Sequence, residues 1–65
     1  MFNGDMTWDE AKSAMREGKK VRNCHFTDEE HFRMVGGDIV CEMGYPMAGW
    51  YRGEDWQKTG WSIFQ

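Results

Sequence analysis

The sequence is poor in the features that mark secreted and membrane proteins. Its 65 residues include only two cysteines, Cys24 and Cys41, whereas a small secreted scaffold usually carries at least about four. No apolar run approaches the roughly 20 residues of a membrane-spanning helix, and Met1–Met6 lacks the basic and apolar regions of a signal peptide. We therefore expect free thiols, a cytoplasmic location and no membrane partner.

The sequence also lacks an excess of positive charge. Eight Lys and Arg residues stand against eleven Asp and Glu residues, which gives a formal net charge of −3 at pH 7. Proteins that hold duplex DNA through its phosphates carry a basic patch on a basic domain, so we do not expect duplex DNA as a partner. The carboxylates are also too few for a DNA mimic.

The first half of the chain contains a clear helix signal. Thr7 and Glu10 have the Thr-x-x-Glu spacing of a capping box, in which each side chain accepts a hydrogen bond from the other residue's amide. Gly18 supplies the left-handed residue that ends such a helix. Apolar residues between these signals recur on one helix face: Trp8, Ala11, Ala14 and Met15. An isolated helix of this length is unstable, so this face must pack on another element.

That element is predicted to be a sheet. Lys20–Phe26 is typical of a strand, although neither of its faces is cleanly apolar. Gly36 and Gly37 fit a two-residue hairpin turn between strands at Phe32–Val35 and Asp38–Met43.

Shorter signals complete the pattern. We expect one helical turn at most at Thr27–Glu30, a strand break at Gly44–Pro46, a short strand at Trp50–Arg52, a turn or single helical turn at Gly53–Lys58, and a closing strand at Trp61–Phe64. The predicted fold is α+β, with one N-terminal amphipathic helix packed on a small bent antiparallel sheet in a single domain of residues 1–65. Such a sheet has exposed edges, and a chain this short buries only about 60% of its unfolded surface. We therefore expect a homo-oligomer, a dimer or a tetramer.

The residues that usually carry catalysis or bind metals do not form a recognisable pattern. His25 and His31 are six residues apart and Cys24 and Cys41 form no Cys-x-x-Cys pair, so the spacing of a zinc site is missing. No phosphate loop or paired nucleophile and base is present. We expect no enzyme activity, no metal and no cofactor.

Aromatic residues are concentrated toward the end of the chain. Of the ten aromatic residues, six lie between Tyr45 and Phe64, close to Arg52 and Asp55. Flat rings beside a guanidinium group and a carboxylate suit a nucleotide, whose base stacks and whose phosphate pairs with arginine. The alternative is that the rings form the core, so we expect two or three of the four tryptophans to be buried and about one, such as Trp50, to face a pocket. Arg22, Arg33 and Arg52 are expected at the solvated surface, with pairing at a subunit interface as the alternative.

Three segments resemble the phage Thoeris anti-defence family, second type, in their order and spacing. They are Met6–Ala11, Gly18–Arg22 and Asp55–Ile63, which together cover roughly half of the chain, at its two ends. The resemblance implies a homo-oligomer in the host cytoplasm that sequesters a cyclic nucleotide immune signal without cleaving it. The ligand is then a cyclic ADP-ribose isomer or a cyclic oligonucleotide.

The resemblance also implies roles for individual residues. Phe26 occupies the position of the family's strand-end tryptophan and is expected to stack on a base. Asp55 matches an aspartate of the closing motif and is expected to accept hydrogen bonds from the ligand or to orient a neighbouring residue. Arg22 and Asn23 adjoin the family's arginine and are expected to approach a phosphate. Trp61 is expected in the core.

Two other classes of function stay open at this stage. In the first, the protein is an inhibitor that blocks a host defence enzyme or nuclease by direct contact. In the second, it is a minor phage structural protein whose aromatic rings serve only to pack the core.

Overall fold

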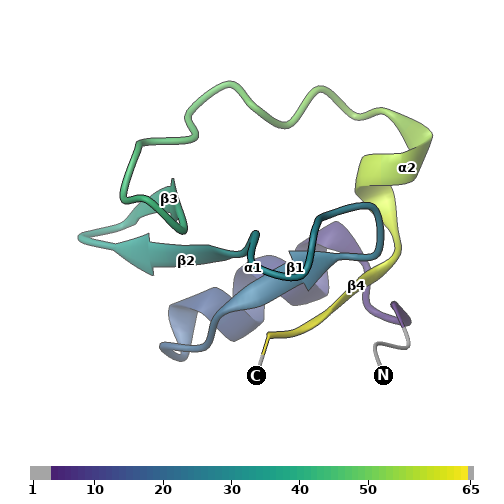
Figure 1. Ribbon diagram of the computed structural model, residues 1–65, viewed down its shortest axis with the longest axis horizontal. Helices are drawn as coiled ribbons and strands as arrows, with labels where there is room; N and C mark the ends of the chain where they lie inside the picture. The colour runs from purple at the N-terminus through teal and green to yellow at the C-terminus, as the bar shows by residue number, and fades with distance from the viewer. Residues whose placement is uncertain (1–3, 65) are drawn as a thin grey trace.

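The computed structural model describes residues 4–64, which form one helix-and-sheet unit (Figure 1). In chain order the elements are α1 (Trp8–Arg16), β1 (Val21–Asn23), β2 (Phe32–Val35), β3 (Asp38–Cys41), α2 (Asp55–Lys58) and β4 (Trp61–Ile63). The strands form an antiparallel sheet in the order β3-β2-β1-β4, and α1 packs against it. The predicted α+β fold is confirmed.

Helix α1 begins and ends where the sequence predicts. The Thr7 hydroxyl accepts from the Glu10 amide at 3.2 Å, and the Glu10 carboxylate accepts from the Thr7 amide at 2.8 Å. At the other end Gly18 has φ +92°, and its amide donates to the Met15 carbonyl at 3.0 Å. The predicted apolar face is the buried one: Trp8, Ala11, Ala14 and Met15.

The β2–β3 hairpin also follows the prediction. Gly36 and Gly37 form its turn with φ of +58° and +87°, a backbone region that other residues rarely adopt. Strand β3 ends at Cys41 rather than at the predicted Met43, because the chain turns back there and the Gly44 amide donates to the Cys41 carbonyl.

Two strand predictions need correction. Strand β1 ends at Asn23 instead of continuing to Phe26, because the Asn23 side chain accepts from the His25 amide at 3.0 Å and closes a turn. The predicted strand at Trp50–Arg52 is wrong. This segment is irregular, and its backbone bonds to the Gln57 side chain rather than to a neighbouring strand.

The two outer strands of the sheet have backbone partners beyond the sheet itself. On β4, the Trp61 amide and carbonyl both bond to Met6. On β3, the Cys41 amide donates to the Tyr45 carbonyl and the Met47 amide donates to the Ile39 carbonyl. The sheet edges are therefore less open than the sequence suggested. The homo-oligomer stays a prediction.

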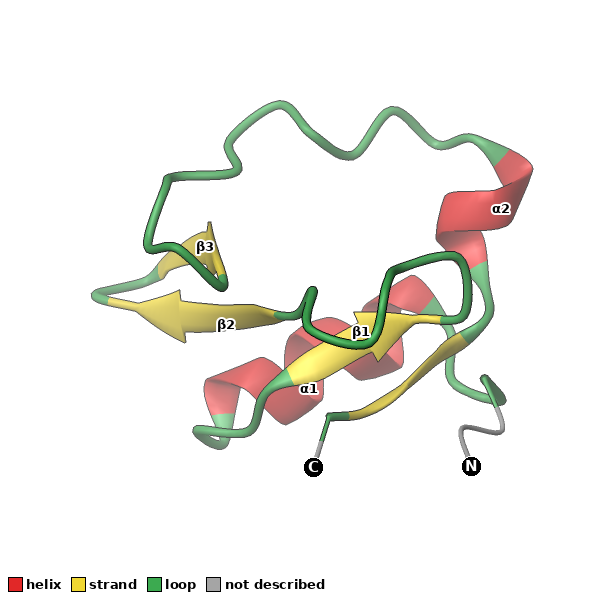
Figure 2. Ribbon diagram, viewed as in Figure 1, coloured by secondary structure: helices red, strands yellow, loops and turns green. Residues whose placement is uncertain are grey.

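A core rich in aromatic side chains fills the space between α1 and the sheet. Trp61 is fully buried, and Trp8 and Phe32 are buried beside it. The long connection from β3 to α2 arches away from the sheet (Figure 2), and it is anchored to α1 because Tyr51 stacks on Trp8 with 4.8 Å between ring centroids. Neither helix among residues 4–64 has the length and apolar character needed to cross a membrane.

Candidate ligand-binding site

Trp50 lies at the centre of a group of aromatic rings that begins in the core and ends at the surface. On its inner side it contacts Phe32 and Trp61, with ring centroids 4.8 and 5.8 Å away. On its outer side it contacts Phe26 at 6.0 Å and Trp56 at 5.6 Å, with interplanar angles of 77° and 89°. Trp50 and Phe26 are half-buried, whereas Trp56 is 41% exposed.

Two hollows open next to Trp50 and Trp56, and both tryptophans line each of them. The first, here called the Glu30 hollow, has a volume of about 470 Å³ and is completed by His25, Phe26 and Glu30. The second, the Arg52 hollow, measures about 330 Å³. Its remaining lining residues are Gly49, Arg52, Glu54 and Gln57. Both volumes fall in the range of small-molecule sites.

A third hollow of about 390 Å³ lies between the β2–β3 hairpin and the long connection. Its walls are largely apolar and aromatic, and the charged residue that lines it is Asp38. Because the described lining contains no cationic side chain, this hollow is a poorer place for a phosphate than the Arg52 hollow.

Three polar side chains are buried in the described part of the chain, and each of them fixes residues of the two hollows. They are Arg22, Asn23 and Gln57, with exposures of 4%, 0% and 3%. Burying a polar group costs free energy unless the group is hydrogen-bonded. The partners of these three side chains therefore show which parts of the chain they hold in place.

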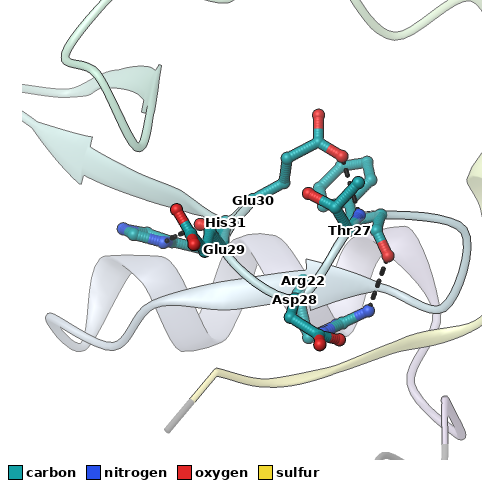
Figure 3. Close-up of polar contacts among 7 residues, drawn as sticks. Arg22, Thr27, Asp28, Glu29, Glu30 and His31 are labelled. Carbon is teal, nitrogen blue, oxygen red and sulfur yellow. Dashed lines mark hydrogen bonds and ion pairs between the residues drawn. The ribbon is translucent and has the colours of Figure 1, made fainter.

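Arg22 holds the segment that contains Phe26. Its guanidinium donates to the Phe26 carbonyl at 2.8 Å and lies 3.9 Å from the Asp28 carboxylate (Figure 3). The following turn is closed by Glu30, whose Oε1 accepts from the Thr27 amide at 2.7 Å. Thr27–Glu30 is therefore a single turn, as predicted.

Asn23 joins β1 to α2. Its Nδ2 donates to the Trp56 carbonyl at 3.2 Å and to the Thr59 carbonyl at 3.0 Å, while its Oδ1 accepts from the His25 amide. The imidazole of His25 in turn meets the Trp56 ring edge-on at 5.7 Å. One buried amide thus places two of the residues that line the Glu30 hollow.

Gln57 performs the same task for Trp50. Its Nε2 donates to the Trp50 carbonyl at 3.0 Å, and its Oε1 accepts from the Arg52 amide at 2.9 Å and from the Glu54 amide at 3.2 Å. The Gln57 carbonyl accepts the indole N–H of Trp61 at 2.7 Å. The backbone of the irregular segment around residues 50–54 is therefore fixed from beneath by a buried side chain.

The structure brings together some of the sequence-predicted site residues. Trp50 lines both hollows, Phe26 lines the Glu30 hollow and Arg52 lines the Arg52 hollow. The side chain of Asp55 is fully exposed and lies 3.8 Å from Lys58, and it lines neither hollow.

Arg22 and Asn23 are placed differently from what the sequence suggested. Both are buried in β1, where their side chains bond to main-chain groups of the protein. The prediction that Arg22 lies at the solvated surface is wrong, because its guanidinium is needed to bond the turn after β1. The expected surface location of Arg52 is confirmed.

Sequence reasoning did not select Trp56, Gln57, His25 or Glu30 as site residues. A signal for Gln57 was available, because Glu54 and Gln57 have capping-box spacing and the Glu54 amide donates to the Gln57 Oε1 at 3.2 Å at the start of α2. The tryptophan prediction is confirmed: Trp8 and Trp61 are buried, Trp50 is half-buried and Trp56 faces the solvent.

The metal-binding residue types are scattered over the described residues. Cys24 is exposed and Cys41 is half-buried, and both are free thiols. Residues 4–64 contain no group of three or more His, Cys, Asp and Glu side chains that is arranged to hold a metal ion.

Comparisons of the chain with family models, curated proteins and solved structures give no match.

Proposed function

We propose that this protein binds and sequesters a cyclic nucleotide signal, as the resemblance to the Thoeris anti-defence family implies. The observation that supports this most is the Arg52 hollow, in which Trp50, Trp56 and Arg52 meet. An exposed indole offers a stacking face to a base, and an exposed guanidinium pairs with phosphate in a charge-assisted, bidentate geometry.

The arrangement of the Arg52 hollow favours binding by a preformed site. Gln57 holds the backbone amides of Arg52 and Glu54, so the segment that carries the guanidinium is already fixed before a ligand arrives. Preorganisation of this kind strengthens binding because less conformational entropy is lost on association. Glu54 lines the same hollow and is available to accept from a ribose hydroxyl or a base amine.

Thermal unfolding in the presence of candidate nucleotides tests the proposal. A ligand that binds only the folded state stabilises it by roughly 2.7 kcal/mol at a hundredfold excess over its Kd. We expect cyclic ADP-ribose isomers or cyclic oligonucleotides to raise the Tm, and chromatography of the released ligand to recover it intact. A Tm that no nucleotide changes would contradict the proposal, and a cleaved ligand would contradict sequestration.

Two variants locate the nucleotide. Arg52→Gln removes the cation that lines the hollow and is expected to reduce the Tm shift that the nucleotide causes. Asp55→Asn tests whether the Asp55 carboxylate accepts hydrogen bonds from the ligand, as the resemblance implies. Arg33→Gln is the matched control, because it removes the same charge from β2, away from both hollows. Equal Tm shifts in Arg52→Gln and Arg33→Gln would place the nucleotide elsewhere.

A second candidate function is inhibition of a host protein by direct contact. Three large apolar side chains on and after the β2–β3 hairpin favour it, because Val35, Met43 and Tyr45 are 51%, 71% and 63% exposed. A failed nucleotide screen together with a partner whose binding is lost in Tyr45→Ser would support this alternative.

A further inference from the structure

The Glu30 hollow differs from the Arg52 hollow in its charge. Its five lining residues include one carboxylate, that of Glu30, and neither a lysine nor an arginine is among them. A phosphate is therefore repelled by this hollow and a cation is attracted to it. The formal net charge of −3 acts in the same direction.

Two rings of the Glu30 hollow stand nearly at right angles to a third. Phe26 and Trp56 each meet Trp50 nearly at right angles, at 77° and 89°. One exposed ring face is enough for a base to stack on, whereas rings set at right angles offer walls on more than one side to a compact, rounded group. The negative faces of such rings attract a cation, and this is how aromatic cages bind quaternary ammonium groups.

The carboxylate of Glu30 is fixed in its place at the hollow. Its Oε1 accepts from the Thr27 amide at 2.7 Å, and Figure 3 shows the side chain turned back toward Thr27. Among residues 4–64 no donor bonds to the other carboxylate oxygen, so this oxygen is available to a ligand.

The walls of this hollow are held in place by buried polar side chains. Arg22 bonds the carbonyl of Phe26, Asn23 bonds the carbonyl of Trp56 and the amide of His25, and Gln57 bonds the carbonyl of Trp50. Every aromatic wall is therefore tied to a buried polar side chain. These bonds satisfy main-chain groups and hold the walls of the hollow in fixed positions before a ligand arrives.

We infer that Phe26, Trp50, Trp56 and Glu30 form an aromatic cage for a methylated ammonium cation, beside the nucleotide hollow, with which the cage shares Trp50 and Trp56. The trimethylammonium group is held by the ring faces and the carboxylate of Glu30 neutralises its charge. Such a group occurs both in small choline-like molecules and in the side chain of trimethyllysine.

Titrations followed by the indole N–H signals of a ¹⁵N-labelled sample test the cage. The probes are choline, N-acetyl-trimethyllysine amide and 3,3-dimethyl-1-butanol, which has the shape of choline without its charge. We expect both cations to shift the signals of Trp50 and Trp56 and the neutral alcohol to bind at least about tenfold more weakly. The tighter of the two cations identifies the source of the ligand.

Matched variants separate the cage from general charge effects. Glu30→Gln keeps an oxygen that accepts from the Thr27 amide but removes the charge, and it is expected to weaken choline binding by about tenfold. Glu29→Gln removes the same charge one residue earlier, outside the lining of the hollow, and is expected to leave binding unchanged. Trp56→Leu removes an exposed wall and is expected to abolish binding in a chain that still folds.

Three results would each overturn the inference. They are an alcohol that binds as tightly as choline, equal effects of Glu30→Gln and Glu29→Gln, and signals of Trp50 and Trp56 that neither cation moves. Because Trp50 and Trp56 line both hollows, the residues that separate the two proposals are Glu30 and Arg52. Choline binding is expected to be weakened by Glu30→Gln and not by Arg52→Gln, and nucleotide binding is expected to show the reverse.

Discussion

At the scale of single residues, Asn23 shows how much of this structure depends on one buried amide. It is fully buried, and it bonds two carbonyls around α2 and one amide of the turn after β1. Its polar atoms therefore serve the architecture, although the residue type and its place near the end of a strand suggested contact with a ligand.

We expect Asn23→Ala to lower the free energy of unfolding by at least about 1–3 kcal/mol, because it leaves buried main-chain groups without partners. Urea denaturation followed by circular dichroism measures this change. Ser62→Ala on β4 is the control, since the Ser62 hydroxyl is buried with no hydrogen-bond partner among the described residues and its loss is expected to cost little. Equal stabilities of the two variants would show that the Asn23 bonds are unimportant.

At the scale of elements, helix α1 and the β2–β3 hairpin depend on local signals that act within a few residues. The capping box at Thr7 gives hydrogen-bond partners to amides at the start of the helix, and the two glycines adopt the positive φ that the hairpin turn needs. Neither feature depends on a residue far away in the sequence. The segment around residues 50–54 is the opposite case, because the buried Gln57 side chain fixes it.

Thr7→Ala is expected to destabilise the chain by about 1 kcal/mol, since the Glu10 amide loses its acceptor at the first turn of α1. The urea midpoint measures the loss. Ser13→Ala serves as the control because Ser13 is an exposed position of the same helix. A Thr7 variant as stable as the Ser13 variant would mean that the capping box contributes nothing.

At the scale of the whole molecule, stability depends on aromatic burial between α1 and the sheet. Trp8 contacts Trp50, Tyr51 and Trp61, so it joins the helix, the long connection and β4. A chain of this size has a total stability of only about 3–10 kcal/mol.

Trp8→Ala is therefore expected to unfold the protein, because truncating a buried tryptophan costs about 3–5 kcal/mol. Far-ultraviolet circular dichroism and the loss of a cooperative thermal transition report the unfolding. Trp56→Ala, which removes the tryptophan that is 41% exposed, is expected to remain folded. A cooperative transition in the Trp8 variant at the wild-type temperature would exclude this account of the core.

The sequence by itself determined the elements whose causes are local: the α1 boundaries, the glycine turn of the hairpin, the helical turn before β4 and the class of the fold. It also identified Trp50 and Arg52 as aromatic and cationic neighbours. These predictions succeeded because capping, positive φ and periodicity depend on residues close together in the chain.

Only the tertiary structure decided which polar residues support the site and which line it. Arg22 and Asn23 are residue types that also bind ligands, and the sequence alone did not show that both side chains turn inward. The partners of Asn23 lie up to 36 residues away and come within reach only in the folded chain. The charge of the Glu30 hollow was decided in the same way. Glu30 is far from Trp50 and Trp56 in the sequence and lines a hollow with them only in the folded chain, whereas Arg52 is their neighbour in the sequence.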